Sequence, residues 1–293
     1  MVYLAFAACC LIWGSTFLFI SIGNDTVPPM WAATIRLAIA TPLLAFIALL
    51  TRAAFPRGRA LRAAVLFGFF NFGINLALLY WGELTVPSGI AAVFYATVPL
   101  STGLIAAGLA VERLDLRKML LAAVALGGVA VIFAGELSLA VPFGGLFAIF
   151  GAATAAALST VVLKQAPQSP LPANAVGSAV GAAVCLAGSV LTGEPRAIPD
   201  TAAAWIPILY LVVAGSLGAY VIFTWLVHHW AVTNAALVGV VVPVIAVLLG
   251  TVFRAERSAG ATYAGAAIVL LAVVAALRLS ARRTTPREDA TAA

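Results

Sequence analysis

The chain has 293 residues, of which 64% are hydrophobic and only 9% are charged. A water-soluble domain usually has roughly 45–50% apolar and about 25% charged residues, so this composition excludes one. It predicts an integral membrane protein whose main partner is the lipid bilayer. The net charge of +6 therefore does not indicate a nucleic-acid-binding surface.

Ten apolar stretches are each long enough to cross the bilayer as a helix, which takes about 20 residues. The links between them are short, and none could form an extramembrane domain. We therefore predict an all-α polytopic membrane protein with ten transmembrane helices. In chain order the stretches are 3–22, 31–50, 61–81, 87–111, 115–135, 142–164, 173–192, 202–227, 234–253 and 258–278.

The distribution of basic residues predicts the orientation. With the N-terminus in the cytoplasm, the opposite side holds only Arg196, Arg254 and Arg257, and Arg36 lies within a span. Cytoplasmic segments are enriched in Lys and Arg, so this asymmetry favours both termini inside a plasma membrane. The residues on the cytoplasmic side are then Arg52, Arg57, Arg59, Arg62, Arg113, Arg117, Lys118, Lys164, Arg278, Arg282, Arg283 and Arg287.

An internal repeat relates the segment 81–113 to the segment 225–257, 144 positions later and without a gap. Matches of Ala, Val and Leu are expected by chance in so apolar a chain. A proline followed at one fixed spacing by Glu-Arg is not. The pair occurs as Pro99 with Glu112-Arg113 and again as Pro243 with Glu256-Arg257.

Ten spans divide into two halves of five, and an odd number inserts the second half with the opposite orientation. We predict a first five-helix repeat over residues 1–139 and a second, inverted repeat over 140–279. Residues 280–293 are rich in charged and small residues and are predicted to form a disordered cytoplasmic tail.

This arrangement resembles the drug/metabolite transporter superfamily and its EamA domains. The resemblance depends on Trp13-Gly14-Ser15-Thr16-Phe17 in the first span and on the duplicated proline and Glu-Arg pair. Within the superfamily the chain is similar to bacterial amino-acid and metabolite exporters of the YddG type. The resemblance implies a protein of the bacterial inner membrane. It also implies a central cavity lined by helices 1, 3, 4, 6, 8 and 9, with helices 5 and 10 at the periphery.

Charged groups are rare at membrane depth because their insertion costs about 2.5–3.5 kcal/mol or more. Apart from Arg36, the spans contain no Lys, Arg, Asp or Glu near mid-depth. A carrier of sugar phosphates or nucleotide sugars would need several cationic groups. The sequence therefore favours a neutral or zwitterionic substrate. Arg36 itself is interpreted as a structural residue in preference to a substrate clamp.

The polar and aromatic side chains at depth are the candidates for substrate binding. Asn71 and Asn75 lie four residues apart and share a helix face, and Tyr95 lies one turn before Pro99. The alternative for these three is helix clamping or ordinary packing. The full set of predicted binding residues is Trp13, Thr16, Asn71, Phe72, Asn75, Tyr95, Ser159, Tyr220 and Thr224.

The function favoured is a secondary transporter that exports amino acids, including aromatic or other neutral ones, or similar small metabolites by alternating access. Pro99 and Pro243 are the predicted hinges. The alternatives are a sugar-phosphate or nucleotide-sugar translocator with the same fold and a membrane-embedded transferase. We expect no enzymatic activity, no cofactor and no metal. The expected partners are a small-molecule substrate and lipid, with the protein a monomer or a homodimer.

Overall fold

The computed structural model describes residues 1–86, 88–134, 141–254 and 260–284, and every element in these ranges is helical. The first half comprises α1 (Val2–Asn24), α2 (Pro29–Leu50), α3 (Gly58–Phe67), the π-helix η1 (Gly68–Asn75), α4 (Leu76–Gly82), α5 (Ser88–Tyr95), α6 (Val98–Gly108) and α7 (Leu116–Ile132). The second comprises α8 (Phe143–Lys164), α9 (Pro170–Leu191), α10 (Ala202–Tyr210), the π-helix η2 (Leu211–Ala219), α11 (Tyr220–His229), α12 (Val232–Ala235), α13 (Val238–Arg254) and α14 (Gly260–Thr284).

Within the described ranges, nine helical segments are long and apolar enough to cross a membrane. The predicted span 115–135 corresponds to α7, which has 17 residues and is therefore about 26 Å long. This is slightly short of the roughly 30 Å of hydrocarbon in a bilayer. The all-helical polytopic class is confirmed, and the count of ten spans stays a prediction that depends on α7.

The two halves have matching elements. α2 and α9 each have 22 residues, and α3 and α10 each lead into a π-helix that continues as α4 or α11. The π-helices lie 143–144 positions apart, close to the offset of the sequence repeat. π-Helical turns are rare, so their recurrence at matching positions is independent evidence that the halves have the same internal structure.

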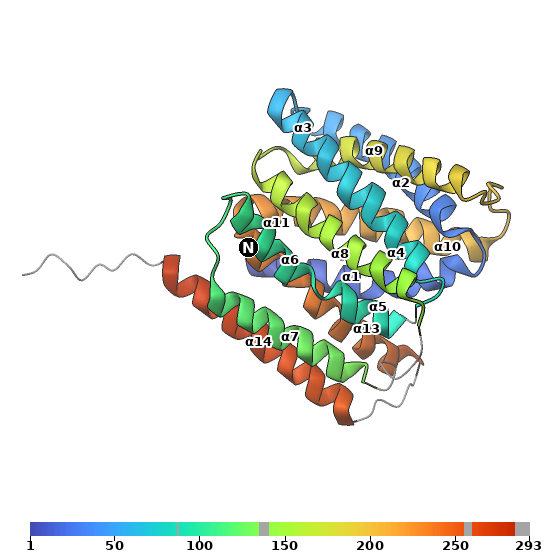
Figure 1. Ribbon diagram of the computed structural model, residues 1–293. Helices are drawn as coiled ribbons and strands as arrows, with labels where there is room; N and C mark the ends of the chain where they lie inside the picture. Colours follow the sequence, from blue (N-terminus) through green and yellow to red (C-terminus); the bar gives the residue numbers. More distant parts are fainter. Residues whose placement is uncertain (87, 135–140, 255–259, 285–293) are drawn as a thin grey trace, which may run out of the picture.

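Corresponding helices of the two halves pack against each other on both flanks of the molecule. α2 lies along α9 on one flank, and α7 lies along α14 on the other (Figure 1). Between these flanks, α1 of the first half packs against α13 of the second half. In the matching contact, α8 of the second half packs against α6 of the first half. Elements of both halves therefore surround the centre of the bundle, while α7 and α14 stand to one side.

Glycines allow the closest helix contacts. A Cβ atom placed on Gly68 would lie 2.5 Å from the Cα of Gly177, so the backbones of η1 and α9 are in direct contact. On the α7–α14 flank, a Cβ on Gly265 would lie 2.6 Å from the carbonyl oxygen of Gly128. The neighbouring Gly127 has open space around it, so the close approach within the monomer uses the adjacent face of α7.

Both spans that carry the repeated proline are broken, but at different distances from it. The first break lies at Ala96–Thr97, and Pro99 is at the start of α6, where a proline is readily accepted because that N–H has no helical partner. The second break lies at Ala236–Leu237, and Pro243 is in the interior of α13. Of the two repeated prolines, Pro243 alone therefore lies in the interior of a helix.

A carboxylate from the first half caps a helix of the second half. Glu112, in the link between α6 and α7, accepts hydrogen bonds from the Val232 backbone N–H and from the Thr233 hydroxyl, the latter at 2.8 Å. Both donors are in the first turn of α12, where unpaired N–H groups and the helix dipole favour a negative charge. The repeat counterpart, Glu256-Arg257, lies outside the described residues.

The first five residues of the predicted disordered tail, 280–284, are helical. α14 continues through Thr284; Ala281, Arg282 and Arg283 are residue types that favour helix and extend the preceding span. Residues 285–293 lie outside the described part of the chain.

Candidate functional site

A cavity of about 90 Å³ lies between the two halves. Its lining comes from α1, from η1 and α4, from α5 and α6, from α8, from α11, and from α12 and α13. These are the six spans that the family resemblance implied, and one further span contributes: Arg36 of α2 also reaches the cavity. Among the described lining residues none belongs to α7 or α14.

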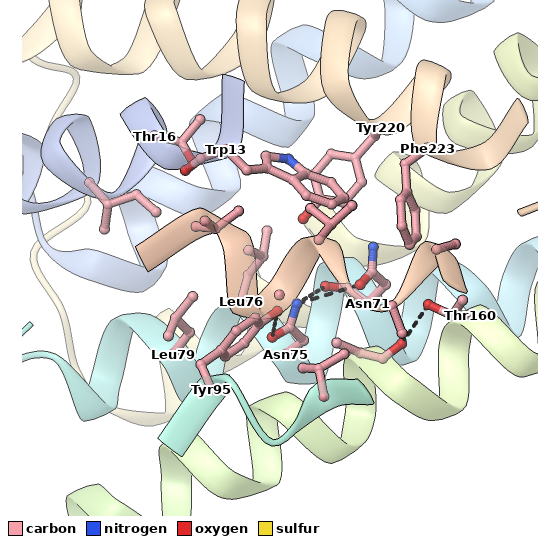
Figure 2. A pocket seen from close by; sticks show the side chains of 18 of the residues that line it. Trp13, Thr16, Asn71, Asn75, Leu76, Leu79, Tyr95, Thr160, Tyr220 and Phe223 are labelled. Carbon is pink, nitrogen blue, oxygen red and sulfur yellow. Dashed lines mark hydrogen bonds between the residues drawn. The ribbon is translucent and has the colours of Figure 1, made fainter. Parts of the chain in front are cut away.

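One side of the cavity is a network of amide and hydroxyl groups. The Tyr95 hydroxyl donates to Asn75 Oδ1 at 3.2 Å. Asn75 Nδ2 in turn donates to the Asn71 carbonyl oxygen at 3.1 Å and lies 3.5 Å from Asn71 Oδ1. All three side chains line the cavity (Figure 2). The predicted shared face of Asn71 and Asn75 is therefore observed, within a π-helix instead of an α-helix.

The Asn71 amide retains an unused donor. Its Nδ2 atom is buried and has no acceptor at hydrogen-bonding geometry, although the side chain also lies against the Tyr220 hydroxyl. Figure 2 shows this amide nitrogen directed toward the space beside Tyr220 and Phe223. A buried donor without an acceptor costs about 1–3 kcal/mol, so a ligand with an acceptor at this point would recover that energy.

The opposite side is an aromatic wall from α1 and α11 (Figure 2). The ring centroid of Trp13 lies 5.1 Å from that of Tyr220 and 5.0 Å from that of Phe223. Behind this wall, Phe72 meets Tyr220 edge-on at 4.5 Å. Separations and tilts of this kind are favourable between aromatic rings and hold them in place. The wall is therefore a rigid apolar surface that faces the amide network.

Six of the nine predicted binding residues line the cavity: Trp13, Thr16, Asn71, Asn75, Tyr95 and Tyr220. The other three are buried outside its lining. Phe72 packs against Gly177 and Gly181 of α9. Ser159 donates to the Ala156 carbonyl oxygen at 2.7 Å, and Thr224 accepts from Asn174 at 2.8 Å. Of the three, Phe72 contacts the ring of a lining residue, Tyr220.

The lining contains three charged, polar or aromatic side chains that were not among the predicted binding residues: Arg36, Thr160 and Phe223. Phe223 lies three residues after Tyr220, so its helix spacing could have indicated it. Thr160 follows Ser159, and only the rotation of α8 decides which of the two faces the cavity. Arg36 was interpreted as structural, and it does have protein partners, but its side chain also borders the cavity.

The described lining combines amide, hydroxyl and aromatic groups with one guanidinium and has no carboxylate, imidazole or thiol. Across the described residues, no three His, Cys, Asp or Glu side chains are grouped as metal ligands would be. The groups present can hydrogen-bond to and stack against a small organic molecule.

The sequence matches the model of the EamA-like transporter family twice, over residues 1–134 and 143–278. An Escherichia coli K12 protein, described as the uncharacterized inner membrane transporter YedA, is 29% identical over 270 residues, covering 90% of this chain and 86% of its own. A probable terminal-alkyne amino-acid exporter of Streptantibioticus cattleyicolor is 34% identical over 120 residues, 41% of this chain and 40% of its own.

A solved structure aligns with 97% of this chain and 99% of its own at a TM-score of 0.78 and 20% identity, which shows that the fold is shared. The relatives and the apolar helices together support a multi-pass protein of the inner membrane. Two copies of the family domain cover most of the chain, in agreement with the repeated helices. The chain therefore belongs to the EamA-like transporter family and is a membrane transporter.

Proposed function

We propose that the protein exports neutral amino acids, aromatic ones included, or similar small zwitterionic metabolites by alternating access. The observation that carries this proposal is the cavity between the halves, in which Trp13, Tyr220 and Phe223 face the Asn71 and Asn75 amides. An aromatic wall suits an apolar side chain, and amides supply both donors and acceptors for ammonium and carboxylate groups. The name of the Streptantibioticus relative, an amino-acid exporter, points to the same substrate class.

The cavity size supports a mechanism with moving halves. A cavity of 150 Å³ holds about one benzene molecule, so one of about 90 Å³ is too small for an aromatic amino acid. Substrate entry then requires the walls to separate. Because α1 and α11 form one wall and η1 and α5 the other, relative movement of these groups would enlarge the site.

The two halves would be inverted relative to each other, with both termini in the cytoplasm, as the charge distribution predicts. Glu112 would then cap α12 on the cytoplasmic side and hold that end closed. Opening toward the cytoplasm would separate Glu112 from the first turn of α12. The relatives are named as transporters, and we propose transport without an enzymatic step.

Counterflow in proteoliposomes tests this function. Vesicles loaded with an unlabelled amino acid should accumulate the same labelled amino acid when they contain the protein and not when they lack it. Phenylalanine, leucine and alanine form a suitable series, with glucose 6-phosphate as the comparison for a phosphorylated substrate. Accumulation of the sugar phosphate and of no amino acid would contradict the proposal.

Removal of groups from the amide network should weaken apparent substrate affinity. Tyr95→Phe deletes one hydrogen bond to Asn75 and should raise KM roughly three- to tenfold, because a single bond contributes about 0.5–1.5 kcal/mol. Asn75→Ala should have the larger effect, since it removes the hydrogen bonds that Asn75 makes with both Tyr95 and Asn71. The measurement is the concentration dependence of counterflow.

Ser159→Ala is the matched control for these two variants, because Ser159 is buried nearby but bonds only within its own helix. Its KM should stay within about twofold of the wild-type value. If Tyr95→Phe and Asn75→Ala also leave KM unchanged, the network serves helix packing alone.

The two prolines should differ in their effect on turnover. Pro243 has no N–H for the carbonyl oxygen of Gly239, a residue that lines the cavity. Pro243→Ala restores that donor and stiffens α13, so turnover should fall roughly threefold or more with little change in KM. Pro99→Ala alters only the start of α6 and should slow turnover less. Equal effects of both variants, or equal losses in turnover and affinity, would argue against a hinge at Pro243.

A further inference from the structure

Arg36 is the one charged side chain in the described lining of the cavity. It is the eighth residue of α2, about 10 Å along the helix from its first residue, and its side chain is 3% exposed. A cation held this deep in a membrane bundle is rare, and such residues commonly take part in function.

The guanidinium is held by groups of η2 and α4. Arg36 Nε donates to Ser216 Oγ at 3.0 Å, and the Tyr80 hydroxyl also interacts with the guanidinium. A Cβ atom on Gly215 would lie 2.6 Å from Arg36 Nη2, so the guanidinium in its present position packs directly against the backbone of Gly215. Gly215 and Ser216 both belong to the π-helix η2, so this π-helix contacts and positions the Arg36 guanidinium.

These contacts orient the guanidinium but do not neutralise it. Ser216 and Tyr80 are uncharged partners, and across the described residues no carboxylate forms an ion pair with Arg36. An arginine has five N–H donors in a planar fork that matches the two oxygens of a carboxylate. A buried cation without a counter-charge is unfavourable, so an anionic group that enters the cavity would supply the missing partner.

The repeat shows that this charge is present on one side only. α9, the counterpart of α2, contains no Lys or Arg, so the second half has no residue equivalent to Arg36. The otherwise repeated cavity thus has a single cationic end, and a substrate with one carboxylate has one preferred orientation.

We propose that Arg36 binds the carboxylate of the transported substrate and directs the rest of the molecule toward the wall of Trp13, Tyr220 and Phe223. This inference rests on the proposed transport function and narrows it. The substrate is a small carboxylate with an apolar or aromatic side chain. Analogues in which the carboxylate is an amide or is absent are poor substrates.

Three analogues test the proposal: phenylalanine, phenylalaninamide and 2-phenylethylamine, in counterflow and in thermal stabilisation of the purified protein. Wild-type protein should prefer phenylalanine by about tenfold or more, the range for a charge-assisted hydrogen bond. Arg36→Met should remove this preference by lowering the affinity for phenylalanine, while affinities for the amide and the amine, which are cations when protonated, stay the same or rise. Ser159→Ala should retain the wild-type preference.

A merely structural arginine would give a different pattern, in which Arg36→Met lowers the affinities for all three compounds equally. If Arg36→Met does not fold, Ser216→Ala retains the charge but removes its support, and the preference for the acid should then fall severalfold. Wild-type protein that binds and moves the amide as well as the acid overturns the proposal and leaves amino-acid transport intact. Failure to move any amino acid contradicts the proposed function; thermal stabilisation still tests Arg36, and equal stabilisation by acid and amide would count against it.

Discussion

Gly68→Ala is expected to destabilise the protein far more than a methyl group added at a glycine with open space around it. The added Cβ would lie 2.5 Å from both the Cα and the carbonyl oxygen of Gly177. Neither is the end of a flexible side chain, so η1 or α9 must move as a whole. Overpacking typically costs 1–3 kcal/mol, and a contact between two backbones should reach about 3 kcal/mol. The melting temperature in detergent should fall by roughly 5–10 °C.

The same variant should impair transport, because Gly68 is the first residue of the π-helix that carries Asn71 and Asn75 into the cavity. Displacement of η1 from α9 would move both amides. Substrate affinity should therefore fall even at a temperature where the variant is fully folded. This links the stability of the α9 contact to the geometry of the site.

Gly127→Ala is the control. Gly127 is in the interior of α7, and an added Cβ there would meet no atom within 4 Å. Alanine is favoured over glycine inside a helix by roughly 0.5–1 kcal/mol, so the melting temperature should stay the same or rise slightly. Equal melting temperatures for Gly68→Ala and Gly127→Ala would show that η1 and α9 are not in backbone contact.

The sequence predicted the all-helical class and the duplication of the chain, because both depend on properties that do not change with local helix geometry. The inversion of the second half stays a prediction. Composition distinguishes lipid from water as the solvent, and the spacing from Pro99 to Glu112-Arg113 recurs whatever the helix geometry. The π-helices were not predicted. An apolar helix shows the same residue types whether its turns have 3.6 residues or more, so nothing in the stretch 61–81 signalled η1.

The binding residues were predicted only in part because the rotation of each helix is decided by its neighbours. Asn71 lines the cavity while the adjacent Phe72 packs on α9, and Thr160 faces the cavity while the adjacent Ser159 does not. In a chain that is apolar on all sides, hydrophobic periodicity does not distinguish the lipid-facing, packed and cavity-facing sides of a helix. The role of Arg36 depended on η2, whose glycine and serine receive its head group.

Trp13→Ala is expected to lower the affinity for phenylalanine by roughly 30-fold, which corresponds to about 2 kcal/mol. The ring of Trp13 contacts both Tyr220 and Phe223 and lines the cavity. Without it, the substrate ring loses a contact face and the two remaining rings lose their support. Trp13→Phe retains an aromatic surface and should lose less than about fivefold. Binding is measured by competition in counterflow.

Trp81→Ala is the matched control, because it removes a tryptophan side chain outside the cavity. Trp81 is 43% exposed at the end of α4 and does not line the cavity. The affinity of this variant for phenylalanine should equal that of the wild-type protein.

A comparison of alanine with phenylalanine distinguishes the role of Trp13 from that of Arg36, because alanine has a carboxylate but no ring. Trp13→Ala should therefore change the affinity for alanine by less than about threefold, whereas Arg36→Met should weaken both amino acids. A Trp13→Ala protein that loses alanine and phenylalanine equally would show that Trp13 supports the fold and does not form the wall against which the side chain binds.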